Sequence, residues 1–312
     1  MNTQPIKQVL TIAGSDSGGG AGIQADIKAM SANGVFAMSA ITAITAQNTE
    51  EVTDIFELPT SIIASQIDAV FDDFEVAAVK TGMLSSAAIV EVVAKLLKPQ
   101  KVTNLVVDPV MISKTGHALL KPDAIDAVKT QLFPLALLVT PNIHEAQQLS
   151  GLEIKTLADA RRAAKIIHTF GCKYVLIKGG HLPTERATDL LYDGNFFNVF
   201  KGEFIDTPHT HGTGCTFASA IAAHLARGKS VNDAVQSAKT YLTEALRHSL
   251  AIGHGTGPTN HFYFLQTSQQ DAENVRQPVL LIWSVRSVWS VSFNWFVWFV
   301  LFIWLNQTNL MN

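Results

Sequence analysis

A glycine-rich turn comes directly before an apolar helical pattern late in the chain. The turn is His211–Thr216 (HGTGCT), and the pattern is Phe217–Leu225. Backbone N–H groups at the start of a helix, together with the positive end of its dipole, stabilise a phosphoryl group during its transfer. Cys215 lies at this point, where the pKa of a thiol is expected to fall. The turn therefore predicts a phosphate site with a reactive cysteine, the alternative being a small buried side chain.

A second glycine-rich segment lies near the N-terminus. Gly14–Gly22 (GSDSGGGAG) separates an apolar run from a helical pattern that starts near Ile23. Glycines allow a ligand to approach the backbone closely and to contact its N–H groups. The segment is not a P-loop, because no Gly-Lys-Ser/Thr follows, and it lacks the GxGxxG fingerprint, because Ile23 occupies the last glycine position. By itself it indicates either a ligand loop or a flexible turn.

An amide and a carboxylate lie three residues apart just after another apolar run. On the first turn of a helix, Asn142 and Glu145 would point the same way. Such a pair could hold a hydrated Mg²⁺, which proteins usually bind through one or two carboxylates plus substrate phosphates. The alternative is a helix N-cap followed by a stabilising early glutamate. The sequence leaves both interpretations open.

Several other kinds of chemistry find no support. The ten histidines form no HExxH motif, so a zinc site is not expected. His211 is expected to be a surface histidine, with contact to phosphate as the alternative. The two cysteines, Cys172 and Cys215, give no disulfide framework. A formal net charge of -3 supplies no basic surface for a nucleic-acid backbone, which excludes nucleic acid as a partner.

Short apolar runs alternate with amphipathic stretches from residue 7 to about residue 262. Hydrophobic residues make up 47% of the chain and charged residues 16%, as in a folded protein. Nearly continuous apolar runs are typical of parallel strands buried on both faces, and Asp193-Gly194 predicts a hairpin at the sheet's edge. Strands that alternate with helices predict an α/β fold with a mostly parallel sheet. The predicted strands are Val9–Ala13, Val76–Lys80, Leu105–Asp108, Leu137–Thr140 and Val175–Lys178.

Three of the amphipathic stretches predict helices between these strands. Apolar residues recur at helical spacing within residues 63–71 and again within residues 89–97. A third helix is predicted to start at Thr156, whose spacing to Asp159 is that of a capping box, and Gly171 suits its C-terminal cap.

The predicted strands end in polar and small residues. In open parallel sheets, ligands bind at the carboxyl ends of the strands. Turn formation would explain one such end, but five in succession, with charged residues among them, predict a binding site. These ends are Gly14-Ser15-Asp16, Lys80-Thr81-Gly82, Asp108-Pro109, Thr140-Pro141-Asn142 and Lys178-Gly179-Gly180.

Together these segments resemble one family. In order along the chain they are TIAGSDSGGGAGIQADIKA, AITAQNT, VKTGML, VVDPVM, TPNIHEA, IKGGH, HGTGCTFASAIA and GHGTGPTNHF. Over residues 7–262 the chain is similar to bacterial hydroxymethylpyrimidine/phosphomethylpyrimidine kinases of the ribokinase-like superfamily. The resemblance implies a mostly parallel central sheet with helices on both faces, ATP as donor and Mg²⁺ as cofactor. It also implies phosphorylation of hydroxymethylpyrimidine and then of its monophosphate, in thiamin biosynthesis.

The resemblance also assigns roles to residues of the substrate pocket. Gln47 would hydrogen-bond the aminopyrimidine edge, a task that suits an amide because it both donates and accepts. Asp26 and Met83 would complete the pocket together with Gly14.

The catalytic and nucleotide-binding roles follow from the same resemblance. Cys215 stands where most ribokinase-like sugar kinases have an aspartate base, and the pyrimidine kinases characteristically have a cysteine. Gly212 and Gly214 would form the anion hole beside it. Asp108 and Glu145 would hold the Mg²⁺. The nucleotide would lie against Lys178, Gly179, Asn142 and Thr213.

Two other functions stay open. A pyridoxal kinase has the same fold and phosphorylates a similar hydroxymethyl heterocycle, whereas a non-catalytic pyrimidine-binding protein would keep the fold without turnover. The segment around Gln47 and the presence of Cys215 favour the pyrimidine, and the intact glycine turns favour an enzyme. A dinucleotide-dependent oxidoreductase is excluded because the fingerprint is missing.

The last part of the chain has a different composition. All five tryptophans lie between residues 283 and 304, and Pro278–Leu305 is apolar. We therefore divide the chain into a kinase domain, residues 1–264, and an unmatched tail, residues 265–312. The tail is long enough to span a bilayer, but Arg286 and Asn294 would be costly there. An interfacial anchor, a partner-binding segment and an out-of-frame extension are the alternatives, and the abrupt change favours the last.

The expected setting of the kinase domain is the cytoplasm. The first ten residues, MNTQPIKQVL, contain no signal-peptide core. The expected partner is a small-molecule substrate, a membrane contact is not expected for the domain, and the resemblance implies a homodimer.

Overall fold

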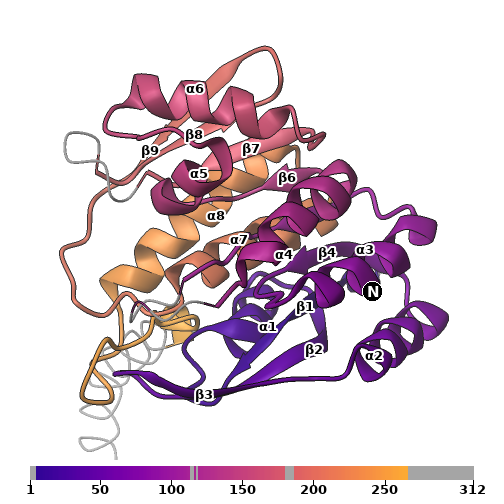
Figure 1. The fold of residues 1–312 in the computed structure, drawn as a ribbon. Helices are drawn as coiled ribbons and strands as arrows, with labels where there is room; N and C mark the ends of the chain where they lie inside the picture. The colour runs from indigo at the N-terminus through magenta and orange to yellow at the C-terminus, as the bar shows by residue number, and fades with distance from the viewer. Residues whose placement is uncertain (1–4, 113–115, 117–118, 180–185, 266–312) are drawn as a thin grey trace, which may run out of the picture. The chain divides into compact units, whose positions relative to one another are not determined.

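The computed structural model describes residues 5–112, 116, 119–179 and 186–265 (Figure 1). The chain divides into two compact units, Met1–His261 and Phe262–Asn312. Of the second unit only residues 262–265 are described, so the predicted tail and its apolar segment Pro278–Leu305 lie outside the described residues. No helix in the described part of the chain is long and apolar enough to cross a membrane.

A single sheet of nine strands forms the centre of the first unit, counted over its described residues. Its strand order is β3-β2-β1-β4-β5-β6-β7-β8-β9. The six central strands pair in parallel, while β3 and the β8–β9 hairpin add antiparallel edges. The strands are β1 (Gln8–Asp16), β2 (Phe36–Gln47), β3 (Val52–Glu57), β4 (Val76–Thr81), β5 (Leu105–Val107), β6 (Leu138–Val139), β7 (Tyr174–Ile177), β8 (Thr188–Tyr192) and β9 (Phe197–Lys201).

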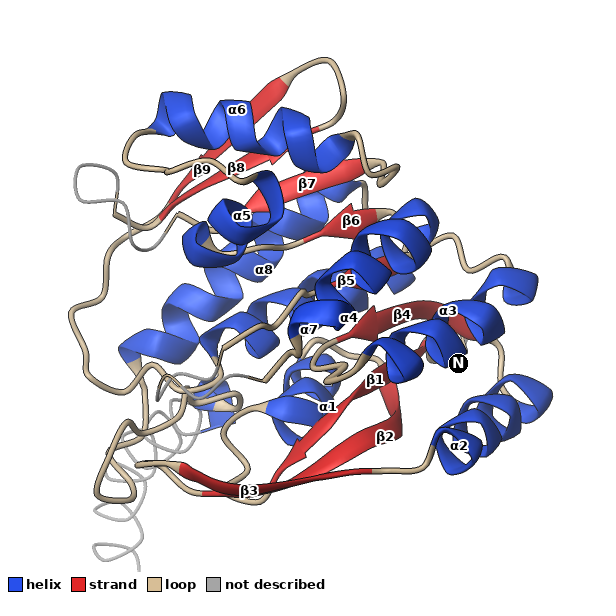
Figure 2. Cartoon of the chain, in the orientation of Figure 1, coloured by secondary structure: helices blue, strands red, loops and turns tan. Residues whose placement is uncertain are grey.

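Helices cover both faces of the sheet (Figure 2). One face carries α1, α7 and α8, and the other carries α2 to α6, which agrees with the predicted α/β architecture. The helices are α1 (Gly22–Ala32), α2 (Thr60–Asp73), α3 (Ala87–Gln100), α4 (Pro122–Ala127), α5 (Ile143–Ser150), α6 (Leu157–His168), α7 (Thr213–Ala226) and α8 (Val231–Arg247). A π-helical turn, Val128–Leu132, and a 3-10 turn, Phe133–Leu135, follow α4.

The core explains the apolar runs of the sequence. Leu10 and Ile12 of β1, Val79 of β4 and Val107 of β5 are fully or almost fully buried and belong to one continuous apolar cluster. On the other face, α7 is buried from Thr216 to Ala226. Its many alanines and its serine are small, which allows the sheet and the neighbouring helices to pack closely around it.

The predicted elements are confirmed with two differences. All five predicted strands, the hairpin and the three helices are present. The capping box of Thr156 and Asp159 is also present, but α6 ends at His168, and Gly171 forms the turn two residues after the cap at Thr169, with φ 100°. The strands β2 and β3 were not predicted from the sequence. They form an antiparallel pair that carries Gln47 at its end.

Candidate active site

The N-terminus of α7 is an open backbone site. Gly212 is its N-cap with φ 75°, and no side chain caps the helix. The hydroxyl of Thr213 donates to the carbonyl of Thr210 and so is turned away from the helix amides. A Cβ on Gly214 would lie 3.4 Å from Nζ of Lys178 and 3.8 Å from Oδ2 of Asp108. The N-terminus of α7, a cation and a carboxylate therefore meet at one point.

An ion pair joins the ends of β5 and β7. Nζ of Lys178 lies 2.7 Å from Oδ1 of Asp108, and the hydroxyl of Thr140 donates to the same oxygen at 2.9 Å. Burial would raise the pKa of Asp108, but Lys178 and Lys80 outweigh it and hold that pKa below its ordinary value. Burial would likewise lower the pKa of Lys178, but Asp108 and Glu145 raise it. Both groups of the pair are therefore charged at neutral pH.

Asn142 and Glu145 form a capping box at the start of α5. The side chain of Asn142 accepts from the amide of Glu145 at 2.9 Å, and Oε2 of Glu145 accepts from the amide of Asn142 at 2.7 Å. The N-cap interpretation is thus confirmed. Burial, and secondarily the charge of Asp108, raise the pKa of Glu145 to about 7 against the opposing effect of Lys178. Two carboxylates that repel each other suit a cation that would relieve the repulsion.

Among the described residues, no cluster of three or more His, Cys, Asp or Glu side chains could hold a metal by itself. A cation at Asp108 and Glu145 would therefore need oxygen ligands from elsewhere, such as the phosphates of a nucleotide. This donor set fits Mg²⁺, which keeps waters and phosphate ligands, and does not resemble a zinc site.

The first glycine segment is held by Asp16. Its carboxylate accepts from the amides of Gly18, Gly20 and Ala21 at 2.8, 3.1 and 2.7 Å. It also accepts a hydrogen bond from Nε2 of His211 at 2.9 Å. Burial would raise the pKa of Asp16, but the hydrogen bonds from His211 and the amides outweigh it and lower that pKa. The expectation of a surface His211 was wrong, because the ring is buried against this carboxylate from the other end of the chain.

Asp16 also fixes the proton of the His211 ring. A carboxylate only accepts, so Nε2 of His211 carries a hydrogen and donates it. The amide nitrogen of Gln47 lies 3.4 Å from the same ring nitrogen. Because that ring nitrogen carries a hydrogen, it cannot accept a hydrogen bond from the Gln47 amide. The amide oxygen of Gln47 accepts from the hydroxyl of Thr45 at 3.1 Å. Gln47 is thus held beside His211 with its amide N–H groups in a position to serve a ligand.

Gly14 and Met83 lie in contact, as a shared pocket requires. A Cβ on Gly14 would lie 2.5 Å from Cε of Met83, so the glycine provides the space that the methionine occupies. The hydroxyl of Thr42 donates to the carbonyl of Met83 at 2.9 Å and fixes its backbone.

Asp26 lies behind this surface rather than on it. Its side chain is fully buried, and its two oxygens receive Nζ of Lys80 at 2.9 and 2.8 Å. The hydroxyls of Thr11 and Ser219 donate to the same carboxylate at 2.6 and 2.7 Å. These contacts occupy both oxygens, so Asp26 is not placed to contact a substrate directly. The pairing of Asp26 with Lys80 and Ser219 was not predicted, because these residues are distant from it along the chain.

Cys215 lies in the first turn of α7, as predicted, but its predicted acidity was wrong. Loss of solvation at this partly buried position raises the pKa of the thiol to about 11. Lys80 acts in the opposite direction, while Asp26 and Asp108 add to the increase. The effect of the helix N-terminus is therefore outweighed by loss of solvation and by two nearby carboxylates.

Gly179 is held at the end of β7. Its amide donates to Oδ1 of Asp189 at 3.1 Å, and a Cβ there would lie 1.7 Å from the carbonyl oxygen of Thr188. Only glycine therefore allows this close approach of β7 and β8.

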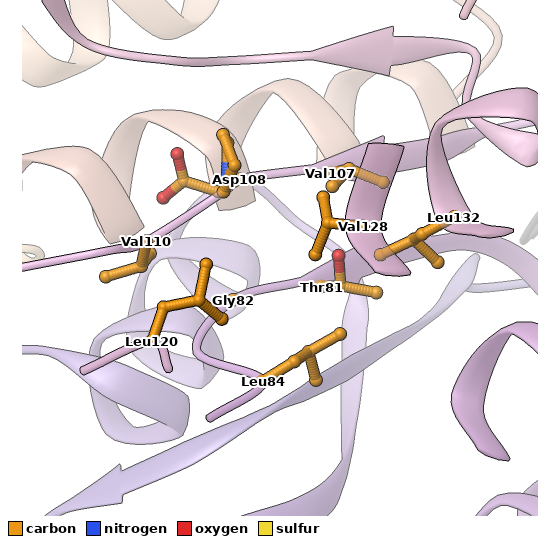
Figure 3. Close-up of a pocket in the computed structure, with 10 residues that line it drawn as sticks. Thr81, Gly82, Leu84, Val107, Asp108, Val110, Leu120, Val128 and Leu132 are labelled. Atoms are coloured by element: carbon orange, nitrogen blue, oxygen red, sulfur yellow. The ribbon is translucent and has the colours of Figure 1, made fainter. Parts of the chain in front are cut away.

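A small pocket lies at the ends of β4 and β5 (Figure 3). It is lined mainly by apolar side chains, including Leu84, Val128 and Leu132. In Figure 3 the carboxylate of Asp108 points away from these side chains. Asp108 belongs to the lining, so the pocket borders the charged groups, but the lining does not include the predicted pyrimidine residues.

Fold and site together define a class of protein. A mostly parallel sheet whose strand ends carry charged residues, with a glycine turn opening a buried helix, is the arrangement of the ribokinase-like small-molecule kinases. The family model for phosphomethylpyrimidine kinase matches residues 16–260, and the chain belongs to that family. The site residues discussed above lie within this range, except Thr11 and Gly14.

Three relatives illustrate the similarity. A hydroxymethylpyrimidine/phosphomethylpyrimidine kinase from Haemophilus influenzae is 50% identical over 264 residues, which cover 83% of this chain and 98% of the relative. The crystal structure of a phosphomethylpyrimidine kinase from Clostridium difficile is 48% identical, with a TM-score of 0.70 over 77% of this chain and 99% of that one. An ADP complex of Bacillus subtilis pyridoxal kinase is 44% identical, with a TM-score of 0.78 over 83% and 99%.

Proposed function

We propose that this chain transfers a phosphoryl group from ATP to 4-amino-5-hydroxymethyl-2-methylpyrimidine, and then a second one to the monophosphate, in thiamin biosynthesis. The observation that carries the proposal is the convergence of the α7 glycine turn, Cys215, Lys178 and Asp108 in a chain of this family. A helix N-terminus and a largely buried cation at one point are what a transferring phosphoryl group needs, because its charge is spread over its oxygens.

In the first transfer, the thiolate form of Cys215 accepts the proton of the substrate hydroxyl and becomes a thiol. This form is a small fraction at neutral pH, because the pKa of the thiol is about 11. The hydroxyl oxygen forms a bond to the γ-phosphorus, and the bond from that phosphorus to the bridging oxygen breaks. The electron pair of this bond leaves with ADP. The amides of Gly212 and Gly214 and the ammonium of Lys178 stabilise the charge on the transferred group.

In the second transfer the nucleophile is a phosphate oxygen of the monophosphate. A phosphate monoester is largely ionised at neutral pH, since its second pKa is about 6. Its oxygen therefore needs no base, and Cys215 has no proton to remove. The two transfers share the anion site but differ in their need for the thiolate.

The pyrimidine would lie between the first glycine segment and the end of β2. Gln47 would bind the aminopyrimidine edge through its amide, while Gly14 and Met83 would contact the ring. Asp16 and His211 would hold this surface in place. Asp26, whose oxygens are occupied, would act through Lys80 and Ser219 rather than by contact.

The nucleotide and its cation would occupy the ends of β5 to β7. Asp108 and Glu145 would supply carboxylate oxygens to Mg²⁺, with Asn142 beside them. Lys178, Gly179 and Thr213 would lie along the nucleotide. When bound, Mg²⁺ would neutralise part of the negative charge of the phosphates.

Pyridoxal is the second candidate substrate. The similarity to Bacillus subtilis pyridoxal kinase supports it, because that structure matches the fold at least as well as the pyrimidine kinase does. Both substrates carry a hydroxymethyl group on an aromatic nitrogen heterocycle. Steady-state turnover with each substrate, ATP and Mg²⁺ decides between them: a larger kcat/KM for the pyrimidine supports the proposal, and a larger value for pyridoxal reverses the order.

The remaining expectations concern the oligomeric state and the cellular location. We expect a cytoplasmic homodimer whose kinase domain, residues 1–264, is active without the tail. Sedimentation of the full chain tests whether it is a dimer. Turnover after truncation at Phe264 tests whether the kinase domain is active without the tail. A truncated chain that does not fold would show that the tail is needed.

A further inference from the structure

A buried ion pair lies beneath the proposed active site. Lys80, at the end of β4, and Asp26, in α1, both have side chains with 0% exposure. Besides Lys80, the carboxylate binds the hydroxyls of Thr11 and Ser219. Replacing such a pair with apolar residues often stabilises a protein, because removing two charges from water is costly. The fold alone therefore does not account for a lysine at this place.

The pair is tied to the inner face of α7. Ser219, which binds Asp26, follows Cys215 by four residues in α7, so both side chains lie on the same face of that helix. A Cβ on Gly82, which comes directly after β4, would lie 2.7 Å from Nζ of Lys80. The ammonium is thus confined between α1, α7 and the end of β4. Ser219, which binds the same carboxylate, lies one helical turn from the cysteine.

Four charged groups influence the thiol of Cys215 electrostatically. Lys80 and Lys178 are cations, and Asp26 and Asp108 are anions. Burial and the two carboxylates disfavour a thiolate, while Lys80 is the strongest single group that favours one. A hydrogen bond from the backbone at Gly22 acts in the same direction. Without Lys80, loss of solvation and the two carboxylates would raise the pKa of the thiol further, because the main opposing charge would be gone.

We propose that Lys80 is a positioning residue whose buried ammonium stabilises the negative charge on Cys215, and that Asp26 and Ser219 hold the ammonium under α7. The inference rests on the proposed function, in which Cys215 removes the proton of the hydroxymethyl group. It explains why a costly charged group lies beneath a helix of small residues. It also gives Asp26 a task that does not require contact with the substrate.

The test is the pH dependence of alkylation of Cys215 by iodoacetamide, measured on the full chain without nucleotide or substrate. Peptides that contain Cys215 and Cys172 are separated by mass, so the buried second cysteine does not interfere. Alkylation requires the thiolate, and one pKa unit changes the thiolate fraction about tenfold below the pKa. We expect Lys80→Met to lower the alkylation rate at pH 8 at least about threefold and to shift the profile to higher pH. A profile that coincides with that of the wild type overturns the proposal.

Two further variants keep the test decisive. Lys239→Met breaks another buried pair, between Lys239 and Asp189, that is not among the charges facing Cys215, and should leave the profile unchanged. If Lys80→Met does not fold, Lys80→Met with Asp26→Asn removes both charges and avoids an unpaired carboxylate. The double variant should shift the profile in the same direction, because Lys80 affects the thiol more than Asp26 does. No substrate is present in the alkylation test. An unshifted profile therefore overturns the role of Lys80, whereas a failed kinase assay would overturn the proposed function.

Discussion

Gly20 and Gly212 approach each other so closely that a Cβ on Gly212 would lie 1.8 Å from the carbonyl oxygen of Gly20. The two residues belong to glycine turns at opposite ends of the kinase domain. His211, the neighbour of Gly212, binds Asp16 in the first turn. The contact therefore joins the turn that would hold the phosphoryl group to the segment that would hold the pyrimidine.

Replacement of Gly212 by alanine should separate the two turns. The added methyl group cannot be accommodated against a backbone carbonyl, and the positive φ of 75° adds backbone strain. We expect kcat/KM to fall at least about tenfold, which corresponds to about 1.4 kcal/mol of lost transition-state stabilisation. Gly228→Ala is the matched control, because Gly228 has φ 85° but nothing within 4 Å of the added atom. Equal activity of the two variants would show that the close contact is unimportant.

Cys215→Ala should separate the two transfers. The first transfer loses its base and should slow by about 10²-fold or more, while the second, whose nucleophile is already ionised, should slow much less. Single-turnover measurements with each acceptor check this difference. Cys172→Ala, which removes a buried thiol bonded to the carbonyl of Ile167, should leave both rates near wild type. A Cys215→Ala enzyme that performs the first transfer at the wild-type rate would remove the base assignment.

Gln47→Leu should weaken pyrimidine binding. Leucine keeps much of the volume but leaves the donors and acceptors of the ring unpaired, which costs about 1–3 kcal/mol. We expect KM for the pyrimidine to rise with a smaller change in KM for ATP. Gln148→Leu, on the exposed side of α5, serves as the control. An unchanged KM would place the pyrimidine elsewhere in the protein.

Glu145 should make the folded state less stable as the pH rises. Its pKa is raised in the fold to about 7 from an ordinary value of 4.5, so the folded state binds its proton more tightly than the unfolded state. The stability that this proton contributes is complete below about pH 4.5 and is lost as the pH rises to about 7. Glu145→Gln should therefore be more stable than the wild type at pH 8, by about 1–3 kcal/mol, and lose that advantage near pH 5.

Urea unfolding at several pH values measures this difference. Glu153→Gln is the control, since the carboxylate of Glu153 is 71% exposed and paired only with an exposed lysine among its described contacts. A Glu145→Gln variant that is less stable than the wild type at pH 8 would mean that the buried carboxylate is stabilised by Lys178 more than burial disfavours it.

Much of the fold could be predicted from local patterns. The central strands are buried on both faces, so each appears as a short continuous apolar run, and the capping box at Thr156 is complete within four residues. The strands β2 and β3 were missed for a physical reason. They form an antiparallel pair near one edge, where buried and exposed positions alternate and exposed apolar residues such as Phe56 occur.

The site was predictable where it depends on strand ends and helix starts. Lys178 meets Asp108, and Gly212 opens α7, because the order of the elements brings them to the same edge of the sheet. Pairings between distant residues could not be predicted in this way. The partner of His211 lies 195 residues away, and the pKa of Cys215 depends on burial that no local pattern reveals.

The most direct test is the mass of the products formed by the full chain from hydroxymethylpyrimidine, ATP and Mg²⁺. We expect a monophosphate that accumulates first and is then converted to the diphosphate, with one ADP released at each step. Pyridoxal in place of the pyrimidine should react more slowly. A chain that binds the pyrimidine but forms neither phosphorylated product, or one that phosphorylates pyridoxal alone, would contradict the proposed function.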